Sequence, residues 1–268
     1  MVVLVRAVPY YIIVLGTAGS GKTSLTSVLQ TYLVSHQLDA ITVNLDPAVE
    51  SLPYKPDVDV RDYVDAREIM RKTGLGPNGA LIASIDMLIS NIEDLKEEIH
   101  SYRANYIIID TPGQMEIFAF RPTGPLVLDA IVGDHKTVAL FLTDITYAIK
   151  PSSLFSALLL ATSTHFRLKY PQINVLTKID LLPREEVERI IEMLEDPENL
   201  ANGIAGERDL RLLWDLDDIE YITEKLTIFE TIPVSNTTGE GFDNLYASIQ
   251  RVVAGGEDYF TEEPNPVL

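Results

Sequence analysis

The glycine-rich stretch at residues 16–23, GTAGSGKT, constrains the fold of this chain more than any other feature. It fits the phosphate-binding pattern G-x-x-x-x-G-K-[ST], whose glycines allow backbone N–H groups to turn inward around phosphate oxygens. An apolar, β-rich run at residues 10–15 precedes it, and residues 24–36 follow it with apolar side chains at helical spacing. A strand, a glycine loop and a helix in this order predict a phosphate site at the amino end of the helix.

Individual residues of this loop have separate roles in such a site. Lys22 would bring a positive charge to the outer phosphates, and the hydroxyl of Thr23 can bind Mg²⁺. A chance match to the pattern is expected in roughly one chain in a hundred of this length, but the flanking strand and helix argue against one. The residues expected to contact the phosphates are Gly16, Gly19, Ser20, Gly21, Lys22, Thr23 and Ser24.

Strand and helix signals alternate along the rest of the chain, which favours an α/β fold with a mostly parallel sheet and helices on both faces. With 268 residues, 46% of them hydrophobic, the chain can form one such P-loop NTPase domain over residues 1–268. We expect helical insertions at residues 48–104 and 184–228, and a flexible tail at 255–268. Strands are predicted at residues 10–15, 40–43, 106–110, 137–143, 173–176 and 231–234, and helices at 24–36, 59–72, 80–100, 152–168, 184–225 and 241–253.

Composition argues against several classes of function. The net charge of −19 would repel a nucleic-acid backbone or an anionic membrane surface. The sequence has no cysteine, which excludes disulfides, cysteine-bound zinc and thiol nucleophiles. No apolar run approaches the ~18 residues needed to cross a bilayer, and the early run lacks the flanking signals of a signal peptide. We therefore expect a cytoplasmic protein that binds neither nucleic acid nor membrane directly.

Polar residues stand at or just beyond the carboxyl ends of the predicted strands. After Gly16, these residues are Asp46, Asp110, Lys178 and Ser235. In open α/β sheets ligands bind at this edge, so the sequence predicts that all five lie around one site.

The segment 110–114, DTPGQ, directly follows a predicted strand. The carboxylate of Asp110 can hold Mg²⁺ through water, and Gly113 lets a backbone N–H approach the terminal phosphate of a nucleotide. Two residues compete for orienting an attacking water, namely Gln114, which follows this glycine, and Asp46, which follows the second strand. We expect them to share that task.

The segment 177–180, TKID, closes the fifth predicted strand and is similar to the guanine-reading motif [NT]-K-x-D. An ionised Asp180 can accept hydrogen bonds from N1–H and the exocyclic amine of guanine, whereas adenine does not offer these two donors together. The stem of Lys178 would lie along the base plane, and Thr177 stands where many GTPases have Asn. The segment Ser235-Asn236-Thr237, after the sixth strand, is expected to add backbone contacts to the guanine oxygen.

Three motifs together resemble those of the GPN-loop GTPases, a family of P-loop proteins in the class of signal-recognition-particle GTPases and MinD-like ATPases. They are the sequence NLDPA at residues 44–48, DTPGQME at 110–116 and Gly76-Pro77-Asn78 between two predicted helices. The likeness covers nearly the whole chain and is that of an archaeal-type member.

The resemblance implies a Mg²⁺-dependent enzyme that hydrolyses GTP to GDP and phosphate as a homodimer. Each chain's loop, Gly76-Pro77-Asn78, would reach the other chain's terminal phosphate, with Asn78 as the donor. We also expect the apolar stripe of the helix predicted at residues 80–100 to serve this dimer, since it would be costly to expose. Eukaryotic relatives imply RNA polymerase as a protein client.

Two other functions remain open at this point. A P-loop ATP-dependent kinase would share the fold, but no arginine-rich lid is visible and Asp180 would lack a partner on adenine. A nucleotide-switched assembly factor is compatible with GTP hydrolysis. Such a factor would bind a protein partner in only one nucleotide state.

Overall fold

The computed structural model describes residues 8–207 and 215–254. Its strands form one seven-stranded sheet in the order β3-β2-β4-β1-β5-β6-β7, and every neighbouring pair is parallel. The predicted fold class, a P-loop α/β sheet covered by helices, is confirmed, with β3 as a strand that the sequence pattern did not predict. The strands are β1 (Tyr10–Gly16), β2 (Ala40–Asn44), β3 (Val58–Asp59), β4 (Tyr106–Asp110), β5 (Thr137–Asp144), β6 (Gln172–Thr177) and β7 (Thr231–Pro233).

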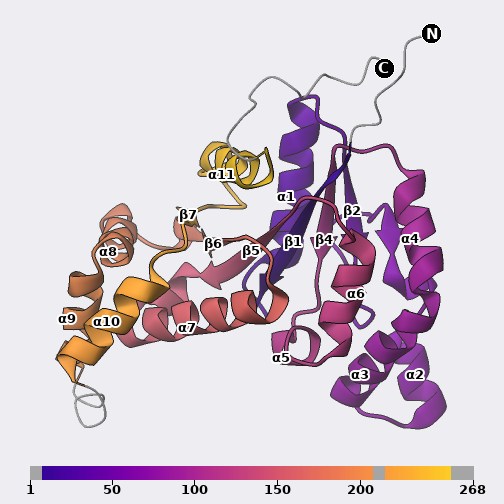
Figure 1. Cartoon of the computed structure of the whole chain (residues 1–268), viewed down its shortest axis with the longest axis horizontal. Helices are drawn as coiled ribbons and strands as arrows, with labels where there is room; N and C mark the ends of the chain where they lie inside the picture. The colour runs from indigo at the N-terminus through magenta and orange to yellow at the C-terminus, as the bar shows by residue number, and fades with distance from the viewer. Residues whose placement is uncertain (1–7, 208–214, 255–268) are drawn as a thin grey trace.

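Helices cover both faces of this sheet (Figure 1). The α-helices are α1 (Lys22–Ser35), α2 (Ala66–Thr73), α3 (Pro77–Leu88), α4 (Ile92–Ser101), α5 (Met115–Phe118), α6 (Thr123–Val132), α7 (Pro151–Leu168), α8 (Arg184–Glu195), α9 (Pro197–Gly206), α10 (Leu216–Leu226) and α11 (Phe242–Ala254). Four short 3₁₀ turns join them, η1 (Val60–Asp62), η2 (Ile89–Asn91), η3 (Ile145–Ile149) and η4 (Ile179–Leu181). Helices α5 and α6 lie in a segment for which no helix was predicted.

The central strand β1 shows why the sheet is covered on both sides. Its side chains alternate between two apolar cores, with Tyr11, Ile13 and Leu15 in one and Ile12 and Val14 in the other. The first core contains residues of α3, α4, α5 and α6, and the second contains residues of α1 and α11. A continuous apolar run is what a strand buried on both faces requires.

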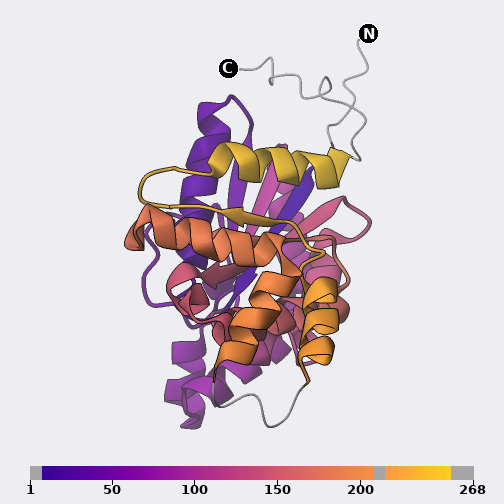
Figure 2. The same cartoon turned by 90° about the vertical axis from the view of Figure 1, so that its left-hand side faces the viewer.

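A separate lobe of helices α8, α9 and α10 lies beyond the β6 and β7 end of the sheet (Figures 1 and 2). Its apolar side chains join those of α7 in a core of their own. The helix predicted at residues 184–225 is therefore three helices, and residues 208–214 between α9 and α10 lie outside the described part. The tail predicted at 255–268 also lies outside it.

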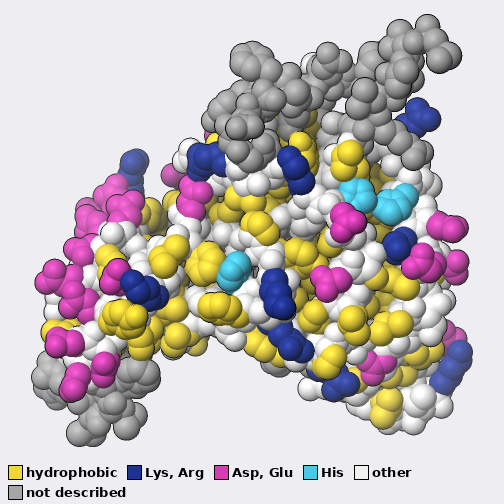
Figure 3. Space-filling view, in the orientation of Figure 1, with side chains coloured by type: hydrophobic (Ala, Val, Ile, Leu, Met, Phe, Trp, Pro, Cys, Tyr) yellow, Lys and Arg dark blue, Asp and Glu magenta, His cyan; other side chains and the backbone are white. Residues whose placement is uncertain are grey.

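Acidic side chains gather on this lobe, as Figure 3 shows. The sequences of α8, α9 and α10 carry ten acidic and three basic residues. Much of the chain's negative charge is therefore concentrated away from the glycine loop that begins α1.

The insertion between β2 and β4 differs from its prediction in two ways. Where a helix was predicted at residues 59–72, the chain first forms β3 and η1, and α2 begins only after Asp65, whose carboxylate accepts from the N–H of Arg67. The single helix predicted at 80–100 is divided into α3 and α4 by the turn η2. Helical periodicity continues through one 3₁₀ turn, so the apolar spacing did not reveal the break.

The apolar stripe of that predicted helix is not an exposed surface. Leu81, Ile85, Leu88, Leu95 and Ile99 are all buried against the chain's own sheet. The expectation that this stripe serves a dimer is therefore wrong.

Gly241, which leads into α11, provides a test of the fold. Its φ is +86°, and a Cβ atom there would lie 2.0 Å from the carbonyl oxygen of Pro233, so Gly241→Ala should destabilise the chain by more than 3 kcal/mol. Gly239 has a similar φ of +80° but nothing within 4 Å of the same position, so Gly239→Ala should cost only about 1 kcal/mol. Urea unfolding of both variants checks this, and equal losses would contradict the role given to Pro233.

Candidate functional site

The parallel register brings the predicted site residues to one edge of the sheet. Val14 of β1 lies opposite Asp110 of β4, and Asp110 lies opposite Asn44 of β2. On the other side of β1, Gly16 pairs with Leu142, and β5 ends beside Thr177 of β6. Because all strands run in the same direction, the segments that leave these ends lie side by side.

The glycine loop has the geometry of a phosphate site. Gly19 and Gly21 have positive φ angles of 79° and 94°, and α1 begins at Lys22 without a side-chain cap, so its first N–H groups can bind an anion. A Cβ atom at Gly16 would lie 2.6 Å from the carbonyl oxygen of Leu142, which explains the glycine at that position. Ser20 is buried inside the loop.

Lys22 is held inside this loop and is only 6% exposed. Its Nζ donates to the carbonyl oxygens of Gly16 at 2.9 Å and Thr17 at 2.8 Å. Burial lowers the pKa of Lys22, and the nearby carboxylates of Asp110 and Asp46 oppose that shift. The loop's own carbonyls thus bind the ammonium group in the free chain.

Asp110 and Thr23 lie together, as predicted for a magnesium site. Asp110 is 2% exposed, and burial raises its pKa to about 6, while the hydroxyls of Thr23 and Tyr54 beside the carboxylate oppose the shift. Tyr54 donates to Asp110 Oδ2 at 3.2 Å, but the buried Oδ1 has no hydrogen-bond partner among the described residues. A hydroxyl and a carboxylate with one unpaired oxygen are hard oxygen donors that fit Mg²⁺.

Asp46 and Gln114, the two candidates for orienting water, flank the same space. Burial raises the pKa of Asp46, and the N–H groups of Ala48 and Gly113 and the charge of Lys22 oppose the shift. Asp46 therefore lies close to Gly113, whose N–H was expected to reach a terminal phosphate. The Oε1 atom of Gln114 is buried without a hydrogen-bond partner in the described structure. Gln114 has an unpaired acceptor oxygen, whereas the Asp46 carboxylate accepts from the N–H groups of Ala48 and Gly113. The geometry of the free chain does not choose between them.

The residues predicted to read guanine are tied to the glycine loop. Lys178 has a positive φ of 62°, and its Nζ donates to Gly19 O and to Asp144 Oδ2, both at 2.7 Å. The Thr177 hydroxyl donates to Ser20 O at 2.8 Å. Thr177 therefore links its strand to the glycine loop through a hydroxyl, although many GTPases have the amide of Asn at this position. The base-reading segment and the phosphate loop are therefore one hydrogen-bonded unit.

Asp180 is positioned by Ser235. The Ser235 hydroxyl donates to Asp180 Oδ1 at 2.6 Å, which leaves Oδ2 for a ligand. The N–H of Ser235, predicted to contact the base, donates instead to Glu240 O at 3.0 Å in the free chain. Ser235 thus lies at the site as expected, but acts on Asp180 through its side chain.

Two residues near the site were not identified from the sequence. They are Tyr54, which contacts Asp110, and Asp144, which pairs with Lys178. Asn236, in the segment expected to contact the base, donates its side-chain amide to Gly21 O at 3.4 Å. Asp144 ends a buried strand and could have been found by the rule that identified Asp110. Tyr54 lies in an irregular segment that gives no such signal.

Gly76, Pro77 and Asn78 form the start of α3 and are all exposed. Pro77 occupies the first helical turn, where its missing N–H removes no helical hydrogen bond. Within the described residues, no hydrogen bond joins these three to the glycine loop. These three exposed residues are therefore accessible to a partner molecule.

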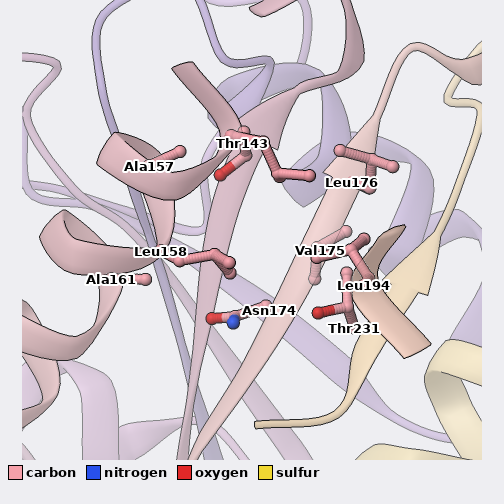
Figure 4. Close-up of a pocket in the computed structure, with 10 residues that line it drawn as sticks. Thr143, Ala157, Leu158, Ala161, Asn174, Val175, Leu176, Leu194 and Thr231 are labelled. Atoms are coloured by element: carbon pink, nitrogen blue, oxygen red, sulfur yellow. The ribbon is translucent and has the colours of Figure 1, made fainter. Parts of the chain in front are cut away.

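The cavity in Figure 4 lies between α7, α8 and strands β5, β6 and β7, apart from the glycine loop. Its volume is about 10 Å³, close to what one water molecule needs. Asn174 lines it, and its Nδ2 atom is buried with no hydrogen-bond partner among described residues. Most of its lining is apolar, and it is far smaller than a nucleotide site.

A glycine loop between a strand and a helix, with a buried acidic residue at the end of the neighbouring strand, defines a P-loop nucleotide-binding protein. None of the helices in the described ranges is long and apolar enough to cross a membrane.

Comparisons with known proteins identify the family. A family model described as "Conserved hypothetical ATP binding protein" matches residues 14–255. A GPN-loop GTPase of Pyrococcus abyssi is 34% identical over 236 residues, covering 87% of this chain and 93% of that protein. GPN-loop GTPase 1 of Dictyostelium discoideum is 30% identical over 94% of this chain, which spans 62% of that longer relative. The crystal structure of a GTPase in apo form from Pyrococcus abyssi has a TM-score of 0.79 and 31% identity, covering 91% of this chain and 97% of that one.

The chain therefore belongs to the GPN-loop GTPases, a family of hydrolases, as its motifs predicted.

The buried carboxyl of Asp110 should make the stability of the free chain depend on pH. Its pKa of about 6 lies above the ordinary value of 3.8, so the cost of burying its charge is absent below pH 3.8 and fully present above pH 6. This cost is on the order of 3 kcal/mol. Asp110→Asn removes the titration and should be more stable than the unmodified chain at about pH 7.5, with a smaller advantage at about pH 5.

Urea unfolding of both proteins at the two pH values, without metal or nucleotide, measures this effect. A stability difference that is the same at both pH values would contradict a raised pKa at Asp110.

Proposed function

We propose that this chain binds GTP with Mg²⁺ and hydrolyses it to GDP and phosphate. The observation that carries the proposal is the joining of Lys178 to Gly19 and of Thr177 to Ser20. These bonds support it because they tie the segment of Asp180, the carboxylate proposed to read guanine, to the glycine loop. The names of the GPN-loop GTPase relatives support the same activity. We take residues 1–268 as one domain with helical insertions at 48–104 and 184–228.

The proposed roles follow from the geometry of the free chain. The N–H groups at the start of α1 and the Nζ of Lys22 bind the phosphates, for which Lys22 exchanges its carbonyl partners for phosphate oxygens. Thr23 and Asp110 would hold Mg²⁺, which supplies positive charge to the phosphate oxygens when bound. Gly113 donates its N–H to the terminal phosphate, and this requires Asp46 to give up that donor.

The release of Asp46 suits a role in catalysis. Once Gly113 turns to phosphate, the Asp46 carboxylate is free to accept a hydrogen bond from the attacking water. Gln114, with its unpaired Oε1, can accept the second hydrogen of the same water. Catalysis in this arrangement comes from positioning and from neutralising charge, as is usual in phosphoryl transfer.

Guanine is favoured over adenine although the matching family model is described by ATP binding. The free oxygen of Asp180 is an acceptor, and guanine presents N1–H and an amine to it, whereas adenine presents an acceptor at its N1 position. The alternative of an ATP-dependent kinase has no feature of the described structure in its favour.

The nucleotide preference should change with Asp180. Asp180→Asn should weaken GTP binding by at least roughly tenfold, because a charge-assisted hydrogen bond to the base is lost. The same variant should improve binding of xanthosine triphosphate, whose ring presents a carbonyl where guanine has its amine. Calorimetric titration of both nucleotides measures the change. Asp217→Asn, an exposed site on α10, is the control with the same loss of charge.

Equal affinity of the unmodified chain for ATP and GTP would overturn the guanine assignment.

We further propose that the chain works as a homodimer in which Asn78 reaches the partner's terminal phosphate. The exposure of Gly76-Pro77-Asn78 supports this, because no described contact ties the motif to its own glycine loop. Leu75, Met87 and Ile89, on the same insertion, are exposed apolar side chains that a partner could cover. These residues replace the buried stripe of α3 and α4 as the apolar surface for dimer contact.

Mixing two inactive variants tests whether Asn78 acts across the dimer. A Lys22→Ala chain keeps Asn78, and an Asn78→Ala chain keeps its glycine loop, so their mixed dimer contains one complete site. Random exchange makes about half of the dimers mixed, and an equal mixture should recover about a quarter of the unmodified GTPase rate per site. Each variant alone should remain near its own baseline.

Phosphate release is measured against total protein, with subunit exchange shown separately by labelled chains. Exchange without recovered activity would rule out action of Asn78 in trans.

The cellular role is carried over from the resemblance. We propose a cytoplasmic, nucleotide-switched assembly factor, with RNA polymerase as the client that the eukaryotic relatives imply. A client of this kind would bind the GTP-loaded and GDP-loaded forms unequally.

A further inference from the structure

The side chain of Tyr54 contacts Asp110, the carboxylate proposed to hold Mg²⁺. Tyr54 lies in a segment that belongs to none of the sequence motifs described above. It lies between Asp46 and β3, is half-buried, and donates its hydroxyl to Asp110 Oδ2 at 3.2 Å. A phenol is protonated at neutral pH, so the Tyr54 hydroxyl acts as the donor in this bond. Its one polar partner in the described structure is therefore the carboxylate expected to hold Mg²⁺.

The segment that carries Tyr54 is fixed at both ends. At one end, Ala48 N–H donates to Asp46 Oδ1 at 2.9 Å. At the other end, Asn44 Nδ2 donates to Asp59 Oδ1 at 2.9 Å, and Arg61 Nη1 reaches back to Val49 O at 3.1 Å. With its ends held, the segment presents Tyr54 to Asp110 in one orientation.

We propose that Tyr54 is a positioning residue for the magnesium site, which orients Asp110 so that its free oxygen faces the metal. The proposal rests on the proposed function of the chain. Tyr54 holds Oδ2, and the opposite oxygen, Oδ1, is the buried atom without a described partner. A carboxylate whose Oδ2 is fixed by Tyr54 can direct the lone pairs of Oδ1 at a cation or its bound water, next to the Thr23 hydroxyl.

Loss of the Tyr54 hydroxyl should weaken Mg²⁺ binding without changing how the chain binds nucleotide in the absence of metal. In Tyr54→Phe, Asp110 keeps its charge but loses the donor that fixes its rotation, and Oδ2 is left buried without a partner. Removal of such outer partners typically lowers metal affinity by roughly 10–100-fold. Affinity for the nucleotide in the absence of metal should stay unchanged, because Tyr54 contacts no residue of the glycine loop in the described structure.

Tyr102 provides a matched control. Its hydroxyl donates to Asp57 O at 2.8 Å, so Tyr102→Phe removes one hydroxyl contact from the same segment without touching Asp110. If Tyr54 only stabilised the segment, the two variants would behave alike.

The test measures release of a fluorescent GDP analogue from the unmodified chain and both variants as MgCl₂ is increased. Tyr54→Phe should need about tenfold or more higher Mg²⁺ for half-maximal slowing of release, with an unchanged rate in EDTA. Tyr102→Phe should follow the unmodified curve, and thermal unfolding confirms that all three proteins are folded.

Four outcomes would overturn the proposal, and they fall into two distinguishable pairs. An unshifted Mg²⁺ curve for Tyr54→Phe, or an equal shift in both variants, refutes the positioning role and leaves the GTPase proposal standing. An unmodified chain that fails to bind the GDP analogue, or binds it without any response to Mg²⁺, refutes the proposed function and the role of Tyr54 with it.

Discussion

Three charged groups share the buried edge of the sheet, and the rest of the site depends on how they balance. Burial works against the charge on each of Lys22, Asp46 and Asp110. The attraction of Lys22 for the two carboxylates offsets part of that cost, while Asp46 and Asp110 repel each other. In the free chain, two carboxylates face one ammonium group, so the cluster lacks positive charge. A cation beside Asp110 would restore the balance, and the same cation would accompany a nucleotide. In the proposed function, a Mg²⁺ ion beside Asp110 would supply positive charge for these carboxylates and for the phosphates that come with it.

At the segment proposed to read the base, strained backbone and hydrogen bonds hold the side chains in place. Lys178 takes a left-handed backbone conformation that costs about 1–2 kcal/mol for a side chain of its kind. In this conformation, Nζ of Lys178 lies within hydrogen-bond distance of Gly19 O and Asp144 Oδ2. Each of these charge-assisted hydrogen bonds stabilises the chain by about as much as the backbone strain destabilises it. Ser235 adds the last constraint by fixing one oxygen of Asp180.

The parts of the site that could be predicted are those at which an apolar run ends in a polar residue. Asp110 and Lys178 follow buried strands, and parallel strands deliver their carboxyl ends to one edge, so adjacency in space follows from sequence. Tyr54 could not be found in this way, since its contact with Asp110 joins residues 56 positions apart and depends on the path of an irregular segment. The two-residue strand β3 was missed for a related reason, because so short a run has no period to detect.

The insertion shows how a correct pattern can support a wrong conclusion. The apolar spacing over residues 80–100 identified helical structure and a buried face, but spacing alone does not say what covers that face. The sheet covers it, since Leu81, Ile85 and Ile99 lie in the same core as β1 and β4. What remains outside is the start of α3, where Pro77 sets the first turn and Asn78 is exposed, with no hydrogen bond to the glycine loop within the described residues. An exposed amide at the start of a helix can donate to a group that another molecule brings, and in the proposed dimer that group is the partner's terminal phosphate.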